Sequence, residues 1–187
     1  AATVIMKSGV RMYGGFIGVE ENKSERDIFM NATLIDGNSE RLAVEGASNT
    51  VLDGFIIVNG GMNIGNVSMK VRNCAFGQNV TALQMSNAVV TLTDSFFGDT
   101  DDFAFYDVPN WNYNETSIIN QGSVLTIKRT GYFGASATAL INEDADQVII
   151  QDSTCKSNVG GAILNTQAAL SIYSSVFENN RAPQGGA

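Results

Sequence analysis

The chain has 187 residues, of which 44% are hydrophobic and 16% charged, with a formal net charge of −8 and no histidine. It is too apolar for a disordered chain, and no apolar run approaches the ~20 residues of a membrane-spanning helix. The lack of histidine excludes Ser-His-Asp and Cys-His catalysis and histidine-based metal sites. The acidic balance argues against nucleic acid as a partner, because phosphates need a basic face.

Residues 1–47 are predicted to form irregular N-terminal coils. Alternating or β-rich runs predict strands at 4–6, 10–16 and 33–37, the last ending in an Asp-Gly corner. Between the second and third of these runs, residues 18–31 carry a dense group of charged side chains. The group consists of Glu20, Glu21, Lys23, Glu25, Arg26 and Asp27. We therefore expect a solvated, charged loop in this part of the chain.

Residues 48–187 repeat one short frame. In its last copy, apolar Leu170 and Ile172 alternate with polar residues, small Ser175 follows, Phe177 points inward and Asn180 closes the segment. The earlier copies are Val148-Ile150-Ser153-Cys155-Asn158, Leu125-Ile127-Thr130-Tyr132-Ala135, Val90-Leu92-Ser95-Phe97-Thr100, Met69-Val71-Cys74-Phe76-Asn79 and Val51-Gly54-Ile56-Asn59. The small positions 54, 74, 95, 130, 153 and 175 are 20, 21, 35, 23 and 22 residues apart. Such a period predicts a solenoid.

Stacked coils of about 20–23 residues require inward side chains to align in columns, because each strand residue pairs with its equivalent one coil away. One predicted column contains Ile56, Phe76, Phe97, Tyr132, Cys155 and Phe177. A second contains Val51, Val71, Leu92, Ile127, Ile150 and Ile172, and a corner column contains Asn59, Asn79, Asn158 and Asn180. The amides of the corner column are expected to hydrogen-bond along the axis.

Two motifs alternate in this repeat. Phe-x-x-Asn occurs at 76–79 and 177–180, and Gly-Gly-Ala occurs at 160–162, followed by Ile163, and at 185–187. Together they resemble the repeats of polymorphic outer membrane proteins, and the stretch 13–20 is similar to the start of secreted bacterial proteins with such repeats. The resemblance implies an all-β, right-handed parallel β-helix and the usual role of that family in display and adhesion at the cell surface or outer membrane. Because the chain stops at Gly-Gly-Ala in the middle of a repeat, we expect it to be part of a longer extracellular protein.

The interval of 35 residues predicts a long aromatic and acidic loop at 99–116. Exposed aromatic side chains beside polar groups suit sugar rings, so this loop is the candidate ligand site. Its candidate ligand-binding residues are Phe105, Tyr106, Trp111 and Tyr113. Alternatively, Phe103, Phe105 and Trp111 fold down and cover the side of the helix. Asp99, Asp101 and Asp102 could hold Ca²⁺, although their spacing fits no complete EF-hand loop; no other cofactor is expected.

A second candidate site is catalytic. In the predicted stack, Asp94, Lys128, Arg129 and Asp152 lie near one another on the outer face. Polysaccharide lyases need a basic residue beside acidic calcium ligands, and glycosidases need paired carboxylates. The alternative is a solvated ladder of alternating charge with no catalytic role.

Two further residue types have limited predicted roles. Cys74 and Cys155 lie in different columns three coils apart, about 14 Å at the strand spacing, so we expect two small core residues and no disulfide. In a secreted eukaryotic protein, Asn22, Asn31, Asn66 and Asn114 would be candidates for glycosylation.

From the sequence, the leading hypothesis is a structural or adhesive stalk whose lateral loops contact a glycan or a surface or matrix protein. The alternative is a carbohydrate-active enzyme, a lyase or glycosidase. The apolar last coil, with Leu164, Leu170, Ile172 and Phe177, predicts continuation into further coils or self-association through the C-terminal edge.

Overall fold

The computed structural model describes residues 2–98 and 114–182, which form three parallel sheets of seven strands each. Sheet A contains β1 (Val4–Ile5), β4 (Val44–Glu45), β7 (Met62–Gly65), β10 (Thr81–Ser86), β13 (Thr116–Gln121), β16 (Leu140–Glu143) and β19 (Ile163–Thr166). Sheet B contains β2 (Arg11–Tyr13), β5 (Thr50–Asp53), β8 (Ser68–Arg72), β11 (Val89–Thr93), β14 (Val124–Lys128), β17 (Gln147–Gln151) and β20 (Leu170–Tyr173). Sheet C contains β3 (Thr33–Asp36), β6 (Phe55–Val58), β9 (Ala75–Gly77), β12 (Phe96–Gly98), β15 (Gly131–Phe133), β18 (Thr154–Lys156) and β21 (Val176–Glu178).

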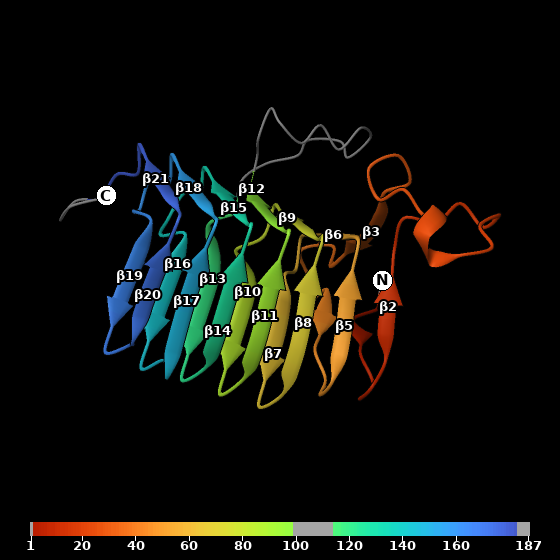
Figure 1. The fold of residues 1–187 in the computed structure, drawn as a ribbon, viewed down its shortest axis with the longest axis horizontal. Coiled ribbons are helices and arrows are strands. Elements are labelled where there is room, and N and C mark those ends of the chain that lie inside the picture. The colour runs from red at the N-terminus through yellow and green to blue at the C-terminus, as the bar shows by residue number, and fades with distance from the viewer. Residues whose placement is uncertain (1, 99–113, 183–187) are drawn as a thin grey trace.

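Successive strands of the chain belong to different sheets, so each coil is one pass through sheets A, B and C. Figure 1 shows the coils stacked along the long axis, with the N-terminus near one end and the C-terminus at the other. The parallel β-helix predicted from the sequence is therefore confirmed. A short 3₁₀ turn, η1 (Lys23–Glu25), lies in the charged loop beside the first coil.

The irregular first 47 residues belong to the same three sheets. Strands β1, β2 and β3 pair with β4, β5 and β6, respectively, and β4 pairs with β7. Their register is offset by about 40 residues in sheets A and B and by 22 in sheet C, since Val4 pairs with Val44, Arg11 with Val51, and Thr33 with Phe55. The charged loop is thus an insertion between two strands of the first coil.

The predicted columns are correct from residue 69 onward and wrong by one residue in the preceding coil. Phe76 pairs with Ile57 rather than Ile56, and Val71 pairs with Leu52 rather than Val51. The reason is Gly54, which was expected among the small inward residues. It has a φ of +85° and makes the turn between β5 and β6, as Asn73 with a φ of +51° does in the next coil, so aligning Gly54 with the small inward residues placed this whole coil one position too early.

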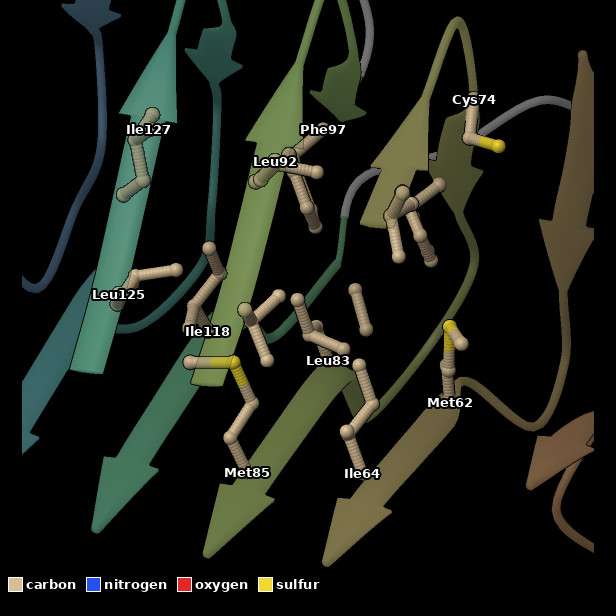
Figure 2. Packing of buried hydrophobic residues seen from close by; sticks show 14 of the residues in the cluster. Met62, Ile64, Cys74, Leu83, Met85, Leu92, Phe97, Ile118, Leu125 and Ile127 are labelled. Carbon is tan, nitrogen blue, oxygen red and sulfur yellow. The ribbon is translucent and has the colours of Figure 1, made fainter. Parts of the chain in front are cut away.

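The interior is filled by these columns. Figure 2 shows Leu83 and Ile118 of sheet A and Leu92 and Ile127 of sheet B projecting into the same core. At the sheet C side, the Phe97 ring stacks on Phe76 at a centroid distance of 4.5 Å and on Tyr132 at 5.0 Å. All of these side chains are buried, which is the main stabilising contribution for a solenoid that has little other interior.

The small column carries a ladder of hydroxyls. The Oγ of Ser153 accepts a hydrogen bond from the backbone N–H of Thr130 and donates to the carbonyl of Gln151, and the Oγ of Ser175 accepts from the N–H of Ser153. The Oγ of Ser95 likewise accepts a hydrogen bond from the backbone N–H of Cys74. Small hydroxyl residues recur here because they satisfy backbone donors at the turn from sheet B to sheet C.

The corner column of asparagines differs from the prediction at two residues: Asn59 does not belong to it, and Asn114 does. Asn79, Asn158 and Asn180 are buried, and the Nδ2 of Asn158 donates to the Oδ1 of Asn180 at 2.8 Å. Asn59 is not in this column, because it has a φ of +53° and lies one position earlier in the turn. Asn114 joins the column instead: its Oδ1 accepts from both the backbone N and the Nδ2 of Asn79.

Candidate functional site

The predicted catalytic residues lie along the turn between sheets B and C. Asp94, Arg129 and Asp152 each follow a paired strand of sheet B and have φ values of 51°, 48° and 51°. Left-handed backbone at the same place in three successive coils brings the three side chains into one row at the strand spacing. Lys128 precedes Arg129 and belongs to the outward row of β14, paired with Thr93 and Gln151.

Arg129 holds Asp94 in a two-point ion pair. Its Nε lies 2.6 Å from Oδ1 and its Nη2 lies 2.8 Å from Oδ2 of Asp94. The hydrogen bond and charge of Asp94 raise the pKa of Arg129, and the charge of Asp152 adds to this effect. Both side chains are largely solvated, so water and salt screen the ion pair and it contributes little to stability. With both oxygens engaged, Asp94 is poorly placed for general acid or base catalysis.

A stronger ionic cluster, which the sequence analysis missed, surrounds Asp53 at the end of β5. The Asp53 side chain is only 2% exposed, and its carboxylate contacts Arg26 Nη2 at 2.6 Å, Arg72 Nε at 2.7 Å and Asn73 Nδ2 at 2.8 Å. Burial raises the pKa of this carboxyl, but the hydrogen bonds from Arg26 and Asn73 and the two arginine charges outweigh burial and leave the pKa below its ordinary value.

The cluster fastens the charged loop to sheet B. In addition to its contact with the Asp53 carboxylate, Arg26 donates hydrogen bonds from Nη1 to the backbone carbonyl oxygens of Gly14 and Asp53. The Tyr13 ring lies beneath two cations, Lys23 Nζ at 4.6 Å and the Arg26 guanidinium at 5.5 Å. The sequence could have indicated this cluster, because Asp53 and Arg72 are opposite charges that pair in adjacent strands. The predicted register was wrong by one residue in this coil and therefore did not place them side by side.

No protein-family model, curated protein or solved structure matches the chain.

The residues predicted in the long loop lie outside the described residues. They are the ligand-binding candidates Phe105, Tyr106, Trp111 and Tyr113 and the Ca²⁺ candidates Asp99, Asp101 and Asp102. Within residues 2–98 and 114–182, no group of three or more acidic or cysteine side chains is arranged to hold a metal ion. The same residues contain no helix long and apolar enough to cross a membrane.

The candidate glycosylation sites differ in accessibility. Asn22 and Asn66 are exposed, and Asn31 is half-buried. Asn114 is 1% exposed, and its Nδ2 donates to the carbonyl of Phe76 at 2.9 Å. This contradicts the expectation of an accessible acceptor at Asn114, because attachment of a glycan to that buried nitrogen requires the corner to open.

The two cysteines are free and buried, as predicted. Burial raises the pKa of each thiol to about 12, so neither is a nucleophile at neutral pH. A small cavity of about 10 Å³ lies beside Cys155, between Tyr132 and Phe177, where the column has a thiol instead of a ring. Its volume corresponds to at most one water molecule.

Charge is distributed unequally among the three sheets. The strands of sheet A carry two carboxylates, Glu45 and Glu143, and no cation. The strands of sheet C carry Asp36, Lys156 and Glu178. Those of sheet B carry four cations, Arg11, Lys70, Arg72 and Lys128, against the single buried carboxylate of Asp53. The strands of sheet B therefore carry an excess of cations in a chain whose net charge is −8.

Proposed function

We propose that this chain is the β-helical stalk of an extracellular or cell-surface protein, with a structural and adhesive role in which lateral loops and faces contact a ligand. The observation that carries the proposal is the solid interior. Stacked side chains fill the described coils, and the cavity at Cys155 is too small for a ligand, so recognition falls to the outside. The resemblance of the Phe-x-x-Asn and Gly-Gly-Ala repeats to those of polymorphic outer membrane proteins supports the same function.

Adhesion is tested directly with beads coated with the purified chain. We expect the beads to be retained under flow on cell monolayers or on surfaces coated with glycans or matrix proteins, and albumin-coated beads to be washed off. A double substitution of Trp111→Ala and Tyr113→Ala tests the loop prediction, because it should reduce retention if these aromatics contact the ligand. Equal retention of the chain and albumin on every surface would reject the adhesive function.

A carbohydrate-active enzyme is the second candidate, favoured by the alignment of Asp94, Arg129 and Asp152 in three successive coils. The ion pair of Asp94 with Arg129 argues against it. Incubation with a panel of polysaccharides, followed by measurement of new reducing ends, separates the two functions. Turnover that disappears in Asp152→Asn would establish the enzyme, whereas no turnover on any substrate agrees with the stalk.

We also propose that a second copy of the chain pairs with the edge formed by β19, β20 and β21. Each of these strands pairs on one side only within the described residues. Leu164, Ile172 and Val176 are 50%, 43% and 49% exposed at this edge, although their equivalents in earlier coils are less exposed. Unpaired strand edges beside apolar side chains favour parallel strand addition.

A further inference from the structure

We propose that the outer face of sheet B binds an acidic polysaccharide, lying along the helix axis across the coils from β2 to β14. This inference rests on the proposed adhesive function and names the ligand class and the surface. It starts from charge: the cations of the sheet strands are concentrated on this one face, while the strands of sheet A carry only carboxylates.

The cations lie in two parallel outward rows. The first row runs Arg11, Val51, Lys70, Thr91, Thr126, Ile149 and Ser171, and the second runs Tyr13, Asp53, Arg72, Thr93, Lys128, Gln151 and Tyr173. Arg11 and Lys70 are two coils apart, as are Arg72 and Lys128, which corresponds to about 10 Å at the strand spacing. This separation is similar to that between acidic groups in a polysaccharide with one such group on every second sugar.

The carboxylate within these two rows, Asp53, does not oppose an anionic ligand. Asp53 is buried and is bonded by Arg26, Arg72 and Asn73, so its charge is more than balanced. It also fixes the Arg72 guanidinium through Nε, with the Arg72 side chain 38% exposed. A guanidinium held in place loses less conformational entropy when it binds a carboxylate or sulfate, and Arg suits both geometrically.

Three other cations are available to a ligand. The structure describes no ion pair for Arg11, Lys70 or Lys128 among residues 2–98 and 114–182. Arg11 and Lys70 are exposed and Lys128 is partly exposed. Their charges are therefore free to neutralise anionic groups, while substitution at these positions breaks no described ion pair.

The remaining side chains of the two rows favour a sugar polymer over other polyanions. Thr91, Thr93 and Thr126 are partly exposed between the cations, and Gln151 continues the second row. Hydroxyl and amide groups can exchange hydrogen bonds with sugar hydroxyls, which a nucleic acid presents only sparsely. The net charge of −8 also weakens long-range attraction of nucleic acid, whose charge density is high.

The experiment measures binding of the purified chain to immobilised hyaluronan and heparin at low ionic strength, with neutral dextran and double-stranded DNA as comparison surfaces. We expect binding to at least one of the two acidic polysaccharides, none to dextran, and weakening with added salt. The triple substitution Arg11→Glu, Lys70→Glu and Lys128→Glu should weaken binding by about tenfold or more. Circular dichroism melting verifies that this variant is folded.

Arg41→Glu is the matched control, because Arg41 lies outside the strands of sheet B and its substitution makes the same charge change at one site. It is compared with Lys70→Glu alone, and only Lys70→Glu should weaken binding. Equal weakening by both would mean a general charge effect and overturn the site, as would binding to neither polysaccharide. Equal or tighter binding to DNA would overturn the ligand class. Bead retention measured in parallel separates the two proposals, because retention without polysaccharide binding rejects this inference and leaves the adhesive function standing.

Discussion

Phe97→Ala tests the stacked column that fills the core. The Phe97 side chain is 0% exposed and lies between the rings of Phe76 and Tyr132, at centroid distances of 4.5 and 5.0 Å and interplanar angles of 3° and 13°. Truncation of a fully buried Phe to Ala costs about 3–5 kcal/mol, because the lost transfer free energy adds to the cost of the cavity. The rings above and below are held by their own strands and cannot close the gap, so we expect a value in the upper half of this range.

The assay is urea unfolding followed by far-UV circular dichroism, with the slope of the transition compared between variants. Phe16→Ala is the matched control, since the same truncation at a side chain that is 39% exposed loses less buried area and leaves no enclosed cavity, and should cost about 1–2 kcal/mol. A double-mutant cycle with Phe76→Ala should give a coupling of about 0.5–1.5 kcal/mol for the ring pair. A loss below about 1 kcal/mol for Phe97→Ala would refute the column.

Three further outcomes are expected. Asp53→Asn should lower the free energy of unfolding by about 3 kcal/mol at pH 7, because Arg26 and Arg72 lose their buried counter-charge. The folded-state pKa of Asp53 is lowered, so its contribution is complete above the unfolded value near 4 and is lost as the pH falls through the folded value; urea titrations of the two proteins should therefore converge in acid, and a constant difference would contradict this. Cys74 and Cys155 should resist iodoacetamide at pH 8 in the native protein and react in denaturant, since a pKa of about 12 leaves roughly one thiol in ten thousand ionised; rapid native labelling, detected by mass spectrometry, would show that the core opens. Ile172→Asp should abolish any concentration-dependent association seen by light scattering, whereas Ser171→Asp, on the outward face of the same strand, should not; a chain that is monomeric at all concentrations would argue against self-association through this edge.

The repeat was predictable because the strand register of a parallel β-helix determines the spacing of apolar residues in the sequence. Every inward residue pairs with its equivalent one coil away, so apolar residues recur at nearly fixed intervals, as from Val71 to Leu92 and from Ile127 to Ile150. The prediction failed by one residue at Gly54, where a turn residue was taken for a small interior residue. Propensity does not separate these roles, since both favour small side chains.

The asparagine corner and the ionic cluster were harder to predict for a different reason. Asn114 follows a long insertion, so its distance from Asn79 of 35 residues hides their equivalence. The cluster at Asp53 combines β5 and β8 with Arg26 from a loop that has no place in the repeat. Periodicity predicts which residues of neighbouring coils are in contact. It does not predict where an irregular loop folds back onto the coils, because that depends on side-chain contacts outside the repeat.

The corner at Asn114 also indicates where the chain can accept a change in loop sequence. Across the insertion of residues 99–113, the pairing continues without slippage: Phe97 pairs with Tyr132 and Leu83 pairs with Ile118, both at an offset of 35. The amide of Asn114 binds the backbone of Asn79 and Phe76 and closes the coil just after the inserted segment. We therefore expect this coil to tolerate replacement of residues 99–113 by a foreign peptide, because the strand pairing and the hydrogen bonds of Asn114 fix where the chain re-enters the coil.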